Sequence, residues 1–205
     1  MSFPEVEDLN TYLTEKERCV LEGTKIGIAG AGGLGSNCAV HLVRAGVRRL
    51  VICDFDVVNE SNLNRQFYFR DQLGRKKVDA LEENLRRIEP DLDLDMRDLR
   101  LDSGNISAVF ADCDIVVEAF DSADAKIMLL QSLMPMGKRL VTASGLAGWG
   151  RSGEIVLRRM GPNVIAIGDG TTSVGNGIAP HSPRVGIAAA MEANTVIAWL
   201  LDRPV

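Results

Sequence analysis

A glycine-rich segment constrains the fold of this chain more than any other feature. The sequence Ile26-Gly27-Ile28-Ala29-Gly30-Ala31-Gly32-Gly33-Leu34-Gly35-Ser36 places a G-x-G-x-x-G pattern directly after an apolar run and at the start of a helical period. Glycines leave the backbone of such a turn unhindered, and they let phosphate oxygens approach main-chain N–H groups at the positive end of the helix. The pattern therefore predicts nucleotide binding at Gly30, Gly32, Gly33 and Gly35. A tight turn required only for packing is the alternative.

From Lys25 onward, short apolar runs alternate with longer segments of helical period, which is typical of a parallel sheet covered by helices. Strands are predicted over Lys25–Ala29, Arg49–Cys53, Leu92–Asp98, Ile115–Ala119 and Leu140–Ala143. Helices are predicted over Gly35–Ala45, Lys76–Ile88, Asn105–Ala111 and Ala125–Met136. The expected fold class is α/β, with a Rossmann-like, doubly wound and mostly parallel sheet.

After Gly145 the alternation of apolar runs and helical segments gives way to shorter runs and a glycine-rich stretch. Two short alternating runs, Glu154–Met160 and Val164–Ile167, predict a hairpin. A glycine-rich loop over Gly168–Gly177 precedes a long helix over Arg184–Leu201 that is apolar on more than one face. We expect one domain over 1–205, comprising a helical arm (1–23), a nucleotide-binding core (24–145), and the hairpin, loop and final helix (146–205).

Composition and charge narrow the classes of function. The chain has 205 residues, of which 46% are hydrophobic, and its net charge is -5, so it lacks the basic field that non-specific nucleic-acid binding needs. No apolar run approaches the roughly 20 residues of a membrane span, and residues 1–10 do not resemble a signal peptide. We expect a cytoplasmic protein without nucleic-acid or membrane partners. The cysteines, which form no C-x-x-C pair, are expected to be reduced and structural: Cys19, Cys38, Cys53 and Cys113.

Two carboxylates follow the second predicted strand. Asp54 stands at the distance from the glycine turn at which a carboxylate commonly binds ribose hydroxyls, and Asp56 is a candidate for the nucleotide site or for capping a turn. Up to this point an NAD-dependent oxidoreductase fits equally well. The following residues are Val57-Val58-Asn59-Glu60-Ser61-Asn62-Leu63-Asn64-Arg65-Gln66, and then Gly74-Arg75-Lys76-Lys77-Val78.

From Asp54 onward this stretch resembles the ThiF/MoeB family of adenylyltransferases, which are related to ubiquitin-activating enzymes. The family pattern runs D-x-D-x-V-x-x-S-N-L-x-R-Q and continues with G-x-x-K. The resemblance is close from Thr24 to about Gly145 and weaker at Ser182–Gly186. The short chain is most similar to the compact ThiF branch, which adenylates the sulfur carrier protein ThiS in thiamine biosynthesis.

The resemblance implies a reaction and three catalytic residues. In these enzymes the C-terminal carboxylate of a small ubiquitin-like protein attacks the α-phosphorus of ATP, which forms an acyl-adenylate and releases pyrophosphate. By similarity, Arg65 and Lys77 neutralise phosphate charge, and Asn62 orients a phosphate or the attacking carboxylate. Solvated surface positions are the alternative for both cations, because several other basic residues lie nearby.

A further carboxylate, Asp121, follows the predicted strand that contains Glu118. By similarity to the D-x-x-D-N ending of that strand in the family, Asp121 is the Mg²⁺ ligand, since Mg²⁺ prefers oxygen ligands. Capping of the next helix is the alternative role. This chain has Glu118 and Ser122 where the family has Asp and Asn, so the resemblance does not extend to Glu118 as a ligand.

Several family features are missing. No cysteine follows Cys113, so the paired C-x-x-C zinc site of many relatives is absent, and no thiol lies in the loop after the fifth strand, where relatives relay the activated carboxyl. Arg18 is only a poor match to the arginine that relatives lend to a neighbouring subunit. His41 is expected to pack or to face solvent. His181 carries little signal, and Trp149 either covers the tail of a partner or pins a loop.

The leading hypothesis is therefore an adenylyltransferase that uses ATP and Mg²⁺, without zinc, and acts on a small ubiquitin-like sulfur carrier protein ending in Gly-Gly. An NAD(P)-dependent oxidoreductase and a non-catalytic binding module of the same fold are the alternatives, and adenylation of a tRNA base or another small molecule also remains open. The apolar final helix, in a fold whose relatives pair, predicts a homodimer.

Overall fold

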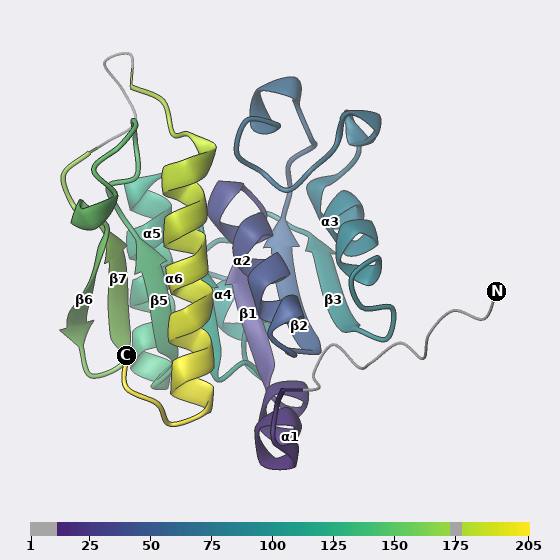
Figure 1. The fold of residues 1–205 in the computed structure, drawn as a ribbon, viewed down its shortest axis with the longest axis vertical. Helices are drawn as coiled ribbons and strands as arrows, with labels where there is room; N and C mark the ends of the chain where they lie inside the picture. Colours follow the sequence, from purple (N-terminus) through teal and green to yellow (C-terminus); the bar gives the residue numbers. More distant parts are fainter. Residues whose placement is uncertain (1–11, 173–177) are drawn as a thin grey trace.

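A central parallel sheet organises the protein, as Figure 1 shows. The computed structural model describes residues 12–172 and 178–205, and within them the sheet has seven strands in the order β3-β2-β1-β4-β5-β7-β6. Neighbouring strands are parallel except β6 and β7, which pair antiparallel. The strands are β1 (Lys25–Ala29), β2 (Arg49–Asp54), β3 (Asp93–Asp98), β4 (Ile115–Glu118), β5 (Arg139–Ala143), β6 (Val156–Gly161) and β7 (Val164–Gly168).

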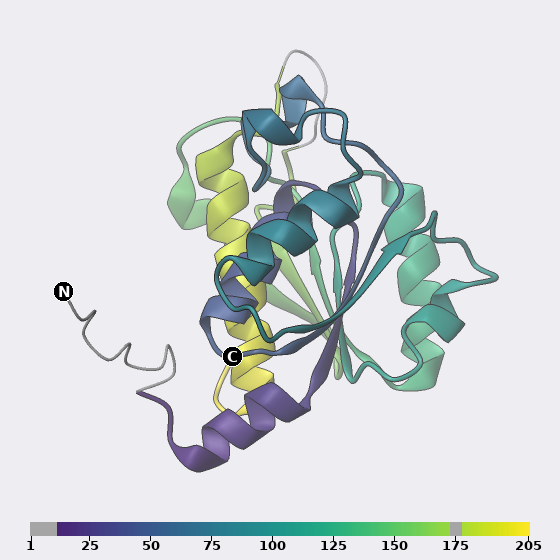
Figure 2. The same cartoon turned by 90° about the vertical axis from the view of Figure 1, so that its right-hand side faces the viewer.

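Helices cover both faces of the sheet. In the side view of Figure 2, α2, α3 and α6 lie on one face, and α4 and α5 lie on the other. The α-helices are α1 (Glu15–Gly23), α2 (Gly33–Arg44), α3 (Lys77–Arg86), α4 (Ile106–Val109), α5 (Ala123–Leu133) and α6 (Ser182–Leu200). The described residues also contain four 3-10 turns, which are η1 (Glu60–Asn62), η2 (Arg70–Gln72), η3 (Met134–Met136) and η4 (Ser152–Glu154). Among these described helices, none has the length and apolar character needed to cross a membrane.

The core forms because the central strands are apolar on both faces. All four residues of β4 are buried, and one apolar cluster fills each side of the sheet. The cluster on the α4 and α5 side contains Phe110 and Leu133, and the opposite one contains Leu42 and Val196. The α/β class and the mostly parallel sheet are confirmed.

The predicted boundaries differ from the structure by a few residues at most elements. The fourth predicted helix ends at Leu133 and continues as a 3-10 turn, because Pro135 has no N–H to donate to the preceding turn. The final helix begins at Ser182, with Pro183 in its first turn, where a missing N–H costs nothing. Part of the predicted glycine-rich loop, residues 173–177, lies outside the described residues.

The apolar faces of α6 are largely covered within the chain. This helix lies against α2 on one face of the sheet, and it buries Val185, Ala188, Ala189 and Val196 there. The apolar excess that suggested a homodimer therefore has an explanation within one chain. The homodimer stays a prediction.

Candidate functional site

An open cavity of about 1030 Å³ lies beyond the carboxyl ends of the central strands. The strand order reverses here, since β1 lies between β2 and β4. Ligands of open α/β sheets bind at this kind of reversal. The lining residues come from the loops after β1, β2, β3, β4, β5 and β7 and from the first turns of α2, α3, α5 and α6. They include Gly30, Gly32, Gly33, Asp54, Asp56, Arg65, Gln66, Lys77, Asp121, Lys126, Gly145, Thr172 and Val185.

The glycine turn forms the floor of this cavity beside β1. Gly30 has a φ of +104°, and a Cβ on Gly35 would lie 1.9 Å from the Gly30 carbonyl oxygen, so both positions require glycine. Gly32 caps α2 without a side chain, and the first-turn amides of a helix have no intrahelical acceptor. The turn thus presents backbone donors and the positive end of α2 to the cavity. Gly35 supports the turn from beneath and is not among the lining residues.

Backbone N–H groups hold both oxygens of the Asp54 carboxylate. Its Oδ2 accepts a hydrogen bond from Ala31 N–H at 2.7 Å, and its Oδ1 accepts one from Asp56 N–H at 2.8 Å. Each carboxylate oxygen retains a second lone pair, which a ribose hydroxyl can use. The structure thus places Asp54 in the cavity, as predicted, and fixes its orientation.

Lys77 and Asp56 form an ion pair at the edge of the cavity. Lys77 Nζ lies 2.8 Å from Asp56 Oδ2, and the Lys77 side chain is only 6% exposed. Lys76 instead pairs with Asp98 on the surface, where its side chain is 44% exposed. The structure therefore brings Lys77 and not Lys76 to the site. The pairing of Asp56 with Lys77 was not anticipated from the sequence.

In the S-N-L-N-R-Q segment, Arg65 and Gln66 line the cavity, whereas Asn62 does not. Arg65 lines the cavity, and its guanidinium donates to Ser61 O at 3.2 Å and to Asn64 Oδ1 at 2.7 Å. Asn62 is not among the lining residues, because its Oδ1 accepts a hydrogen bond from Asn59 N–H and caps η1. The geometry thus gives no support to the phosphate-orienting role predicted for Asn62.

Gln66 is a site residue that the sequence analysis quoted without singling out. Its side chain is 9% exposed and lines the cavity. Within the described residues, its Oε1 is buried without a hydrogen-bond partner. A buried acceptor of this kind costs free energy unless a ligand or water satisfies it. Its place in the R-Q dipeptide of the motif was the signal that could have identified it.

The loop after β4 places an exposed carboxylate on the opposite wall. Asp121 lines the cavity, whereas Ser122 caps α5 by accepting a hydrogen bond from Ala125 N–H. The alternative in which Asp121 is the helix cap is therefore wrong. Among the described residues, no group of three or more His, Cys, Asp or Glu side chains gathers as a metal site.

Glu118 is a structural residue. It is fully buried and accepts hydrogen bonds from Phe120 N–H, from the Thr142 hydroxyl and, through both oxygens, from Lys126 Nζ at 2.9 and 3.1 Å. These partners occupy its carboxylate, so Glu118 does not face the cavity. Its partner Lys126 does line the cavity and is a cation that the sequence analysis missed.

The cysteines are poorly placed for covalent chemistry. Burial raises the pKa of Cys53 to about 12 and of Cys113 to about 11, and it raises the pKa of Cys38 well above its ordinary value. Cys19 is exposed on α1, outside the cavity. All four thiols are free, as predicted.

The two histidines differ in setting. His41 is exposed on α2, in line with the expectation that it packs or faces solvent, and it lines neither of the two cavities. His181 stacks on Trp149, with ring centroids 3.7 Å apart and planes 14° apart. Both rings line a second cavity of about 410 Å³, which shares Ala147 and Thr172 with the first.

Comparisons with known proteins agree with this fold. Over 143 residues the chain is 33% identical to the adenylyltransferase and sulfurtransferase UBA4 of Candida glabrata, a match that covers 69% of this chain and 33% of the relative. Over 110 residues it is 34% identical to the SAMP-activating enzyme E1 of Haloferax volcanii, covering 53% and 41%. The chain thus spans about a third to two fifths of the length of these relatives.

Among solved structures, Escherichia coli tRNA N6-threonylcarbamoyladenosine dehydratase, TcdA, in complex with ATP superposes with a TM-score of 0.87 at 20% identity. This match covers 95% of the chain and 92% of the dehydratase, and it confirms the fold. The ThiF family itself matches residues 8–204. With its glycine turn, strand order and motif in place, the chain belongs to the ThiF family.

Proposed function

We propose that this protein uses ATP to adenylate the C-terminal carboxylate of a small ubiquitin-like sulfur carrier protein and releases pyrophosphate. The observation that carries the proposal is the meeting of the glycine turn, Asp54, Arg65 and Lys77 in one cavity at the switch in strand order. Relatives named as adenylyltransferase and as SAMP-activating enzyme support this class of reaction. Within the class, we infer a ThiS-like carrier and a role in thiamine-type sulfur transfer.

The residues present suit ATP. The cavity has room for a nucleoside triphosphate, and the amino end of α2 supplies backbone donors for phosphate. The unpartnered Oε1 of Gln66, buried against the cavity, can accept a hydrogen bond from a ligand. Lys77 is already held toward the site by Asp56, so a phosphate group would compete with that carboxylate for the ammonium.

The donor set also suits Mg²⁺ bound through phosphate. Mg²⁺ is commonly held by one or two carboxylates together with substrate phosphates and water, and Asp121 supplies one exposed carboxylate on the cavity wall. Asp124 lines the same wall. When bound, the ion would neutralise charge on the departing pyrophosphate. Arg65 and Lys77 would counter phosphate charge from the facing side.

The alternatives leave part of this arrangement unexplained. An NAD(P)-dependent oxidoreductase would use the glycine turn and Asp54, but it has no use for Arg65, Lys77 and Asp121 around the same cavity. A non-catalytic binding module has no need for a buried lysine oriented toward a phosphate site. Both alternatives predict no exchange between ATP and pyrophosphate.

We further infer that the reaction stops at the acyl-adenylate on this chain. A relay needs an accessible thiol whose pKa is low enough to give thiolate. Three cysteines have raised pKa values because they are buried, and Cys19 lies on α1 away from the cavity. A separate sulfur donor would then attack the adenylate.

The test is ATP–pyrophosphate exchange by the purified protein with ATP, Mg²⁺ and a small carrier protein ending in Gly-Gly. We expect exchange that depends on the carrier and an adenylated carrier in the mass spectrum. A carrier with an amidated C-terminus and the Lys77→Ala variant are the matched controls. NAD binding without exchange, or exchange with a tRNA or small acid but not with any carrier, would contradict the proposal.

A further inference from the structure

A fully buried ion pair lies behind the wall between the two cavities. Arg184 Nη2 is 2.5 Å from Asp169 Oδ2, and both side chains are only 2% exposed. Asp169 follows β7, whereas Arg184 lies in the first turn of α6. Neither residue lines either of the two cavities, and neither lies between Asp54 and Val78, the segment whose motif suggested the reaction. The pair therefore needs an explanation of its own.

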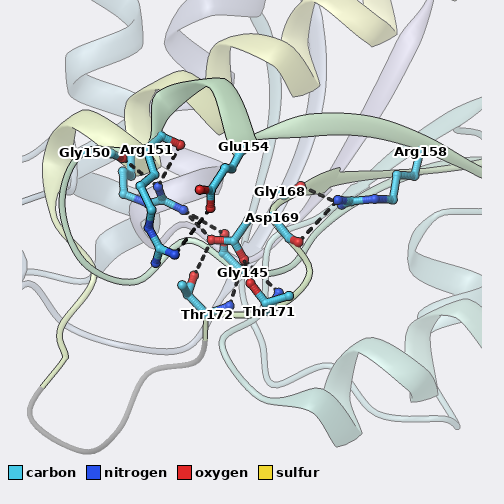
Figure 3. A network of polar contacts seen from close by, with 10 residues as sticks. Gly145, Gly150, Arg151, Glu154, Arg158, Gly168, Asp169, Thr171 and Thr172 are labelled. Atoms are coloured by element: carbon cyan, nitrogen blue, oxygen red, sulfur yellow. Dashed lines mark hydrogen bonds and ion pairs between the residues drawn. The ribbon is translucent and has the colours of Figure 1, made fainter.

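Asp169 organises the segment that follows it. Its Oδ1 accepts hydrogen bonds from the N–H groups of Thr171 and Thr172, each at 2.8 Å, and from the Thr171 hydroxyl at 3.1 Å. Its Oδ2 accepts the Thr172 hydroxyl at 2.8 Å in addition to Arg184. Figure 3 shows Asp169 surrounded by these two threonines and Gly145. The carboxylate is fully satisfied and has no free lone pair directed at a substrate.

Arg184 organises the segment after β5 from the other side. Its Nη1 donates to Gly150 O at 2.7 Å and to Arg151 O at 3.2 Å, and its Nη2 donates to Gly145 O at 3.4 Å. Gly145 packs so tightly on the carboxylate that a Cβ there would lie 2.1 Å from Asp169 Oδ1. The pair thus ties the loop after β5, the loop after β7 and the start of α6 to one point.

These loops form the wall that the two cavities share. Ala147 and Thr172 line both cavities, and Gly145 lines the first. The loop after β5 is also joined to residues 179–181, since Gly148 N–H donates to Ala179 O and Trp149 stacks on His181. The nucleotide side of the site is fixed by other contacts, namely Asp54 with Ala31 and Asp56 with Lys77.

We propose that Asp169 and Arg184 are a positioning pair for the acceptor side of the site, setting the shared wall against which the carboxylate-bearing tail of the carrier protein lies. This inference rests on the proposed function for the identity of the acceptor. The ion pair has no net charge and lines neither cavity, so it affects ligand binding only through the loops that it holds in place. A weaker ion pair shifts the loop after β5, which carries Trp149, and lowers the affinity for the carrier protein, while the affinity for ATP is retained.

The test uses two variants and one control in the full chain. Asp169→Asn keeps the size of the side chain but removes its charge, and Arg184→Lys keeps the charge but removes the planar fork that reaches three carbonyls. Asp95→Asn removes one partner of the partly exposed Asp95–Arg97 pair on β3, outside both cavities, and serves as the control for the loss of an ion pair remote from the site. The Trp199→Phe background leaves Trp149 as the one tryptophan, since the sequence has two.

Three readouts separate positioning from general destabilisation. Trp149 is already 65% exposed, so the fluorescence readout is its stack on His181. In Asp169→Asn and Arg184→Lys, quenching of Trp149 fluorescence by the stacked His181 should weaken, and the KM for the carrier should rise by about tenfold or more, while the Kd for ATP changes by less than about threefold. Asp95→Asn should alter none of these. If one variant fails to fold, as judged by its melting transition, the other carries the comparison.

Unchanged quenching and unchanged carrier KM in a folded variant would overturn the inference, as would equal losses of carrier and ATP affinity. The fluorescence readout needs no carrier, so the proposed function can fail on its own. In that case the wild type shows no exchange, yet both variants still show weaker quenching of Trp149 by His181. An Asp169→Asn variant with normal quenching but no activity would assign the pair to chemistry instead, and the positioning role would be wrong.

Discussion

Replacing Glu192 with glutamine should make the protein more stable, and the gain should grow with pH. Glu192 lies in α6 and is fully buried, and among the described residues neither carboxyl oxygen has a hydrogen-bond partner. Burial, and secondarily repulsion from Glu118, raise the pKa of Glu192 well above its ordinary value, although Lys126 opposes this. The raised pKa favours the neutral acid in the folded protein, a form that glutamine imitates in size and polarity.

The sign and size of the effect follow from proton linkage. Above the ordinary pKa of 4.5, the unfolded chain releases the Glu192 proton while the folded chain keeps it, so the free energy of unfolding falls as pH rises. The loss is about 1.4 kcal/mol for each pH unit over which the folded state stays protonated. The Glu192→Gln variant does not incur this loss, so its advantage over the wild type grows by that amount for each such pH unit.

The assay is urea unfolding of the wild type and of Glu192→Gln at several pH values from 5.5 to 7.5. Hydrogen bonds from Thr172 and Thr171 lower the pKa of Asp169 despite its burial, so Asp169 stays ionised and contributes no slope in this window. Asp112→Asn, whose carboxylate is 85% exposed, is the control and should leave the slope unchanged. A stability difference that is constant with pH, or a glutamine variant less stable at pH 7.5, would refute the reasoning.

Five further predictions concern the site and the assembly. Lys77→Ala and Asp121→Ala should lower the adenylation rate by about 10²-fold while changing the Kd for ATP much less, because charge on pyrophosphate grows as the bond breaks; stopped-flow rates and ATP titrations measure the two effects. Asp54→Ala should mainly raise the apparent KM for ATP, and an equal loss of kcat would show that its role is misassigned. Gly35→Ala should lower the melting temperature and abolish nucleotide binding, since its Cβ would lie 1.9 Å from a carbonyl oxygen. After incubation with ATP, Mg²⁺ and carrier, non-reducing gels should show no carrier adduct of the kind that dithiothreitol removes. Sedimentation at micromolar concentration should show a homodimer, and a monomer would count against that prediction.

The local features of this fold were readable in the sequence. The glycine turn and the strand before it were predictable because chain geometry and steric contact within a few residues decide them, as the clash between Gly35 and Gly30 shows. The cavity position of Asp54 followed equally well, since the carboxyl ends of neighbouring parallel strands meet at one edge of the sheet.

The pairings within the site could not be read in the same way. Asp56 and Lys77 are 21 positions apart, and whether each side chain meets the other depends on the path of the intervening loop. The local bond of Asn62 was equally hidden, because a motif residue can serve the neighbouring backbone, as its Oδ1 does by accepting from Asn59 N–H, and its catalytic role stays a prediction. Gln66 was overlooked because its place in the R-Q dipeptide marks it as a motif residue but does not reveal that its Oε1 is buried without a partner.

The contact between α2 and α6 has a consequence for the order in which the protein can assemble. The amino end of α2 forms part of the glycine turn, but its apolar face packs against a helix that is synthesised roughly 140 residues later. At ~5–20 residues per second, the ribosome needs on the order of 10 s to make the intervening chain. During that interval α2 has an uncovered apolar face, and chaperones that hold nascent chains have a defined segment to protect.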